Sequence, residues 1–148
     1  MHAMESLLRG VFGLAFLALI FVAAIFYILT LSRALEKCSP ASRTMQPGMV
    51  WLLLIPLFNI VWSFLVVIAL GRSLGNEFRL RNLPNPSPEP GKGIGLAMCI
   101  CGACGIIPLI GLIPSFVGFV LWITYWVRIA EFSRMLDSPA LPNFVQGA

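Results

Sequence analysis

The sequence predicts an all-α integral membrane protein, a bundle of four transmembrane helices arranged as two helical hairpins within one domain, 1–148. Hydrophobic residues make up 59% of the chain, charged residues only 11%, and the mean hydropathy is +0.92. A water-soluble domain carries about 25% charged residues, so this composition excludes an ordinary soluble domain. The few charges also divide the chain into three long uncharged runs, which we compare with the roughly 20 helical residues that cross a bilayer.

The first two runs predict one span each. The first holds 23 residues, 10–32, and exceeds the apolar core of a secretory signal, which is about 7 to 15 residues long. We therefore expect a span at 10–32 that is kept and not cleaved. The second run lies between Arg43 and Arg72 and predicts a span at 48–71. Pro47 suits the first turn of this helix, and Pro56 is expected to kink it.

The third run, 93–127, is too long for one crossing. Its 35 residues would form a helix of about 52 Å, well beyond the bilayer. Pro108, Gly111 and Pro114 are suited to a tight turn, so we expect spans at 94–110 and 115–132. Between the hairpins, the sequence predicts a linker at 72–92, in which an amphipathic extension of the second helix precedes a proline-rich spacer.

Basic residues predict the orientation. Four spans place both termini and the linker on one side, where seven basic residues lie, against three in the first loop. The positive-inside rule then favours the inner (cytoplasmic) membrane with both termini in the cytoplasm. The net charge of +4 suits an anionic membrane surface, and no basic cluster indicates a nucleic-acid partner. We expect lipid headgroups to contact Arg72, Arg79 and Arg81.

Small residues recur every four positions around the third span, a pattern that lets membrane helices approach closely. The expected packing positions are Gly91, Gly95, Cys99 and Ala103 in one series, and Ala97, Cys101 and Gly105 in the other.

Cysteines in this span have two interpretations. Cys101 and Cys104 form a CxxC, whose spacing supports dithiol exchange, but cysteine also serves as a small apolar residue. On one helix the sulfurs of Cys99, Cys101 and Cys104 point in different directions, so we predict no metal site and no cofactor.

Polar residues inside membrane spans are functional candidates because burying them in hydrocarbon is costly. Asn59, Ser63 and Thr124 are such residues, and a structural role is the simpler one. Arg128, Glu131 and Arg134 are predicted to form a charge ladder at a solvated helix end. Just before this ladder, an interfacial aromatic belt is expected at Trp122, Tyr125 and Trp126.

An internal repeat relates 21–41 to 119–140, with Phe-Val-x-x-Ile-x-Tyr at 21–27 and again at 119–125. A true repeat would have the first and fourth spans run in opposite senses, as in inverted-topology transporters. Chance similarity between apolar segments is the alternative.

Four stretches together resemble a known group of proteins. They are Trp51-Leu-Leu-Leu-Ile-Pro-Leu-Phe-Asn-Ile-Val-Trp62, the Ser-Leu-x-x-Glu-Phe at 73–78, the Gly-Lys-Gly-Ile-Gly-Leu at 91–96, and 121–130. Over about 45–136 the chain resembles small uncharacterised bacterial multi-pass membrane proteins of the domain-of-unknown-function type. The resemblance implies a membrane bundle and no particular activity.

These features favour a non-enzymatic integral membrane subunit or scaffold, with lipids and other membrane subunits or further copies of the chain as partners. A small transporter or channel, including a homo-oligomeric one, is the first alternative and requires Asn59, Ser63 and Thr124 to line one path. A thiol oxidoreductase using Cys101 and Cys104 is the second.

Overall fold

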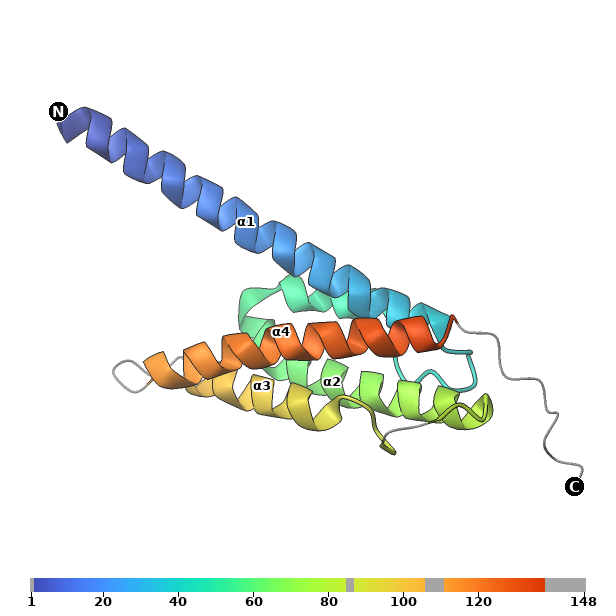
Figure 1. Cartoon of the computed structure of the whole chain (residues 1–148). Helices are drawn as coiled ribbons and strands as arrows, with labels where there is room; N and C mark the ends of the chain where they lie inside the picture. The colour runs from blue at the N-terminus through green and yellow to red at the C-terminus, as the bar shows by residue number, and fades with distance from the viewer. Residues whose placement is uncertain (1, 85–86, 106–110, 138–148) are drawn as a thin grey trace, which may run out of the picture.

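The computed structural model describes residues 2–84, 87–105 and 111–137. Within these ranges the chain forms five helices and no strand (Figure 1). They are α1 (His2–Lys37), the 3-10 helix η1 (Pro47–Leu54), α2 (Pro56–Leu80), α3 (Lys92–Cys104) and α4 (Leu112–Met135). Three are long and apolar enough to cross a membrane, over Met4–Lys37, Phe58–Leu80 and Leu112–Met135. The predicted all-helical membrane class is confirmed at this level.

The segment predicted as one span at 48–71 is broken at Ile55, and that part of the prediction is wrong. Ile55 has extended backbone angles because the following proline disfavours the helical region for the residue before it. Pro56 then begins α2, where its missing N–H costs nothing. The Trp62 indole donates to the Met49 carbonyl at 2.9 Å and holds η1 beside α2. The segment therefore consists of η1, which runs opposite to α2, followed by α2 itself (Figure 1).

Because η1 brings the chain back before α2 begins, the helices do not alternate in direction as predicted. α1, α2 and α4 run the same way, with their C-terminal ends together, and α3 runs back between α2 and α4 (Figure 1). The Arg81 guanidinium joins these ends by donating to the carbonyls of Lys37 and Leu136. The alternating topology placed Lys37 and Leu136 on opposite membrane faces, whereas the structure brings both to one end of the bundle. The N-terminus of α1 lies at the other end of the molecule from the end of α4.

α2 continues past residue 72, where the predicted linker begins, and ends in a turn at Asn82 and Leu83. Asn82 has a positive φ of 51°, and Leu83 N–H donates to the Phe78 carbonyl at 3.0 Å, while Asn82 N–H donates to Arg79. These two bonds form a Schellman-type cap. The predicted helical extension is therefore real, but its apolar side is not free to lie on a membrane, because Leu70, Leu74 and Phe78 are fully buried in the core.

The other predicted spans differ mainly in length. α3 has 13 residues, about 20 Å, and is shorter than the predicted 94–110, of which 106–110 lie outside the described residues, as does Pro108. α4 begins at Leu112 with Gly111 as its N-cap, so Pro114 falls in its first turn. It continues to Met135, three residues past the predicted end.

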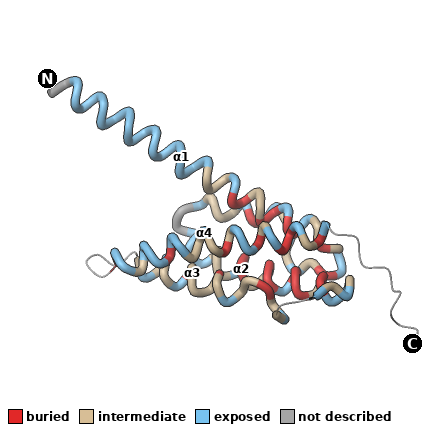
Figure 2. Tube along the Cα trace, in the orientation of Figure 1, coloured by how far each residue is buried: buried red, intermediate tan, exposed pale blue. Residues whose placement is uncertain are grey.

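α1 is only half packed. Its second part contributes Tyr27, Leu31, Ala34 and Leu35 to the core, while its first part, 4–22, extends away from the other helices and is exposed at every position (Figure 2). We call residues 4–22 the projecting half of α1. Its 19 residues are about 28 Å long, nearly the thickness of a bilayer core.

Candidate functional site

The charges gather at one end of the molecule. We define the charged end as the C-terminal ends of α1, α2 and α4 from residues 33, 72 and 128 onward, together with 38–46, 81–84 and 87–92. It carries nine of the ten basic and five of the six acidic residues, a net charge of +4, and the projecting half of α1 holds the remaining Glu5 and Arg9. The basic residues there are Arg33, Lys37, Arg43, Arg72, Arg79, Arg81, Lys92, Arg128 and Arg134.

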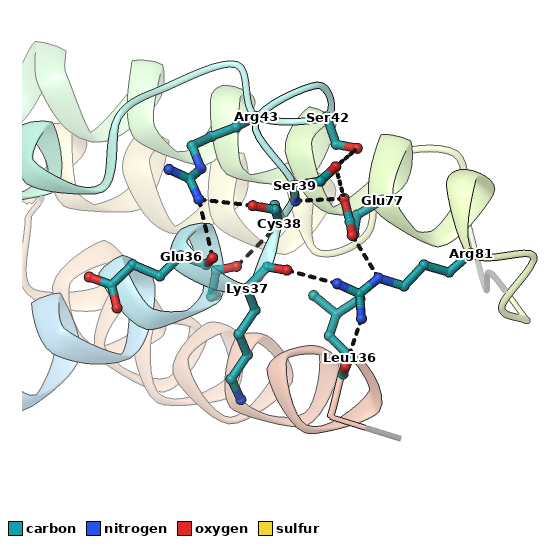
Figure 3. A network of polar contacts seen from close by, with 10 residues as sticks. Glu36, Lys37, Cys38, Ser39, Ser42, Arg43, Glu77, Arg81 and Leu136 are labelled. Carbon is teal, nitrogen blue, oxygen red and sulfur yellow. Dashed lines mark hydrogen bonds and ion pairs between the residues drawn. The ribbon is translucent and has the colours of Figure 1, made fainter. Parts of the chain in front are cut away.

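Three parallel helix ends bring unpaired carbonyls and partial negative charge together, which is unfavourable unless cations lie there. Figure 3 shows how Arg81 meets this need, with its side chain between the three helices. It donates to the Leu136 carbonyl at 2.9 Å, to the Lys37 carbonyl at 3.0 Å and to the Glu77 carboxylate at 2.6 Å. Two other basic side chains cap further carbonyls: Lys37 bonds Ser133, and Arg43 bonds Glu36 and Cys38.

Glu77 is the buried anion of this network, with its side chain 3% exposed. One of its carboxylate oxygens accepts from the Ser39 N–H and the Ser39 hydroxyl, both at 2.8 Å, and the Ser42 hydroxyl lies 3.0 Å from that of Ser39 (Figure 3). The two bonds between Ser39 and Glu77 join segments that the alternating topology separated. Glu77 also forms an ion pair with Arg81, four residues later, at 2.6 Å.

The proline-rich segment is not a free spacer, as the sequence suggested, but lies against α2. A Cβ atom at Gly75 would be 2.1 Å from the Pro88 carbonyl oxygen, and one at Gly71 would be 3.2 Å from the Lys92 Cβ. Pro90 is fully buried. The two glycines, spaced by four, leave the space that this segment occupies, and this small-xxx-small pair was missed in the sequence although its signal was present.

The predicted interfacial belt is an internal cluster instead. Tyr27 of α1 lies 5.4 Å from Trp122 and 6.0 Å from Trp126, measured between ring centroids, and Tyr125 is 1% exposed. The Trp126 indole donates to the Thr30 hydroxyl at 2.9 Å. These aromatic side chains pack between helices because α1 covers this side of α4. The sequence pattern did not predict that contact.

The two segments that suggest an internal repeat lie on α1 and α4, which run in the same direction (Figure 1). Tyr27 and Tyr125, equivalent in the two segments, have ring centroids 6.5 Å apart, and Lys37 pairs with Asp137 at 2.6 Å. The predicted opposite sense of the first and fourth spans is therefore wrong, since α1 and α4 run in the same direction.

α3 packs through its small residues against two neighbours. A Cβ at Gly95 would be 2.5 Å from Val67 of α2 and 2.8 Å from Tyr125 of α4, and one at Gly105 would be 2.6 Å from the Ser115 hydroxyl. Of the other predicted positions, Cys99 is buried, Gly91 has the left-handed φ of 78° at the start of α3, and Ala97 and Ala103 are half-buried.

The four cysteines are free thiols in different surroundings. Cys101 is half-buried, with its Cβ 3.2 Å from the position of a Cβ at Gly118, and Cys104 is exposed in the last turn of α3. Reactive CxxC cysteines are activated near the N-terminal end of a helix, the opposite end from this one. Cys38 is buried at the charged end, where burial raises its thiol pKa to about 11.

The intramembrane polar residues do not converge. The Ser63 hydroxyl donates to the Ile60 carbonyl and also reaches the Cys99 thiol, while Thr124 donates to Val120. Asn59 is exposed at the start of α2, four residues beyond the break at Ile55. No contact among Asn59, Ser63 and Thr124 is found in the described residues.

The predicted headgroup arginines have separate surroundings. Arg81 is used inside the network, and Arg72 pairs with Glu89 at 3.4 Å. Arg79 is exposed, and the described ranges hold no hydrogen-bond or ion-pair partner for it. In the predicted ladder, Arg128 and Glu131 are 3.7 Å apart and more than half exposed, while Arg134 is exposed and has no described partner.

Comparisons with known proteins complete this description. A scan against protein-family models found no matching family, and searches of curated proteins and of solved structures found no match.

Proposed function

We propose that the chain is a non-enzymatic subunit or scaffold of a membrane protein complex, and that the projecting half of α1 binds another membrane protein. One observation carries this proposal: residues 4–22 of α1 are exposed at every position and extend away from the other helices (Figure 2). α1 as a whole is long and apolar enough to cross a membrane. Its second part packs into the core, so an exposed apolar helix segment stands beside a packed bundle, which is suited to assembly.

The same features support a definite orientation in the inner membrane. The uncharged part of α1, 10–32, lies between Arg9 and Arg33, and the charged end carries the net charge of +4. By the positive-inside rule the charged end faces the cytoplasm, with the end of α4, and Arg9 lies at the opposite surface. This orientation replaces the one in which both termini shared a side.

Two features weigh against the alternatives. Transport through one path would need Asn59, Ser63 and Thr124 together, and Ser63 and Thr124 instead bond carbonyls of their own helices. Thiol chemistry would need an activated cysteine, and Cys101 and Cys104 lie in the C-terminal part of α3, away from the helix N-terminus that lowers a thiol pKa. Neither alternative has an observation in its favour.

Photo-crosslinking in native membranes tests the proposal. A photo-reactive phenylalanine analogue replaces Leu14 in the full chain, and a matched variant carries it at Val127, an exposed apolar position of α4. We expect a discrete adduct with one other membrane protein from position 14 and none from position 127. Lipid adducts alone at both positions would overturn the proposal, and an adduct of two copies would favour the homo-oligomeric alternative.

A further inference from the structure

A shallow depression of about 380 Å³ lies at the charged end, between the last turn of α2 and the loop that follows α1. Two of its side chains, Asn76 and Arg79, can donate a hydrogen bond, while the Ser42 hydroxyl belongs to the buried Glu77 network, and no lining residue is acidic. The lining residues are Ala41, Ser42, Asn76, Arg79 and Leu80.

Arg79 is the group that gives this depression its charge. Eight of the other basic residues share the charged end, but those nearest in sequence are already paired: Arg72 with Glu89, and Arg81 with Glu77. Arg79 has no partner within the described ranges, so its planar fork of donors is free for an anion. Phosphate oxygens match that fork in a bidentate arrangement.

The neighbours of Arg79 indicate what kind of anion fits. The Asn76 amide makes only a long bond of 3.4 Å to the Ser42 carbonyl, so it can turn toward a second oxygen. Leu80 beside it is 61% exposed. A charged donor next to an exposed apolar side chain is typical of the lipid interface, where the headgroup and the first acyl carbons lie side by side.

We propose that this depression binds the phosphate of an anionic phospholipid headgroup, with Arg79 and Asn76 as its donors and Leu80 against the acyl chain. This inference rests on the proposed position of the charged end at the cytoplasmic membrane surface. Charge complementarity favours lipid, since the inner leaflet carries the anionic headgroups.

Native mass spectrometry of the full chain in detergent micelles tests the site. The chain is titrated with dioleoyl-phosphatidylglycerol and, separately, with the zwitterionic phosphatidylcholine. We expect saturable binding of one phosphatidylglycerol, and Arg79→Gln should lower its affinity about tenfold, as expected for a lost hydrogen bond to a charged group. Arg79→Lys keeps the charge but loses the planar guanidinium, so its affinity for phosphatidylglycerol should lie between those of the wild-type chain and Arg79→Gln.

Arg134→Gln is the matched control, because Arg134 is also exposed and has no partner among the described residues, but lies on α4, outside the depression. It should change the affinity by no more than about twofold at physiological salt. Equal losses in both variants would overturn the proposal in favour of diffuse attraction. Equal binding of phosphatidylcholine, or full competition by glycerol 3-phosphate, would also overturn it.

Both variants should keep the thermal midpoint of the wild-type chain, so lost binding is not lost folding. The result is independent of the crosslinking at Leu14, because that position lies in the projecting half of α1, away from this depression. Failure of one experiment therefore leaves the other informative.

Discussion

Gly75 of α2 and Pro88 of the proline-rich segment lie in such close contact that a Cβ atom at Gly75 would be 2.1 Å from the Pro88 carbonyl oxygen. This contact holds the segment along α2 and places Glu89 beside Arg72 and Lys92.

Gly75→Ala should therefore destabilise the chain by about 1 to 3 kcal/mol, because the added methyl group must displace backbone. Thermal unfolding in detergent, followed by circular dichroism, measures the effect. Gly93→Ala is the control, since nothing lies within 4 Å of a Cβ there and alanine favours the helix by up to about 1 kcal/mol. Equal midpoints for the two variants would show that the segment is not packed on α2.

Glu77→Gln should lower the free energy of unfolding by about 2 kcal/mol. Glutamine keeps the shape of the side chain but loses the charge that accepts from Ser39 and Arg81, and hydrogen bonds to charged groups are each worth about that much. Glu131→Gln, which removes the exposed pair with Arg128, should cost less than about 0.5 kcal/mol. Chemical denaturation in a fixed detergent compares the two, and a larger loss for Glu131→Gln would contradict the account of the network.

Tyr125→Phe should leave stability unchanged or raise it by up to about 1 kcal/mol, because the buried Tyr125 hydroxyl has no hydrogen-bond partner among the described residues. Thr30→Val makes the opposite change in the same aromatic cluster. It removes the acceptor of the Trp126 indole and should cost about 1 kcal/mol. The thermal midpoints of both variants test these roles of the Tyr125 and Thr30 hydroxyls. A lower midpoint for Tyr125→Phe than for Thr30→Val would contradict them.

Cysteine labelling should separate Cys38 from Cys104. The thiolate is the reactive form, and burial raises the pKa of Cys38 to about 11, so this thiol stays neutral and unreactive at pH 8 until the fold opens. Cys104 is exposed and should be modified first by an apolar maleimide in detergent. Peptide mass spectrometry after timed labelling gives the order, and rapid modification of Cys38 in the folded chain would contradict its burial.

The sequence predicted the structural class of the protein better than the direction in which its helices run. Composition and the spacing of charges were sufficient for an all-helical membrane chain and for the approximate positions of α1 and α4, because the cost of burying charge in lipid limits where apolar helices can lie. They were not sufficient for direction. Pro56 can kink a continuous helix or begin a new one, and the bond from Trp62 to Met49 that decides between them joins residues 13 apart.

The candidate sites divide in the same way. Small residues around Gly95 could be found from spacing alone, since close helix packing leaves a periodic pattern. The network of Arg81 could not, because its partners are the backbone carbonyls of Lys37 and Leu136, which leave no mark in the sequence. Arg72, Arg79 and Arg81 are alike in the sequence, and only their neighbours in the fold distinguish them.

The most direct measurement concerns which surfaces share a side of the membrane. Single cysteines replace Met4, Ala41 and Asn82, all exposed positions, in sealed vesicles of known orientation. A membrane-impermeant maleimide should label positions 41 and 82 from the same side and position 4 from the opposite side. Labelling of position 41 from the side opposite to position 82 would restore the alternating four-span topology and contradict the parallel arrangement of α1, α2 and α4.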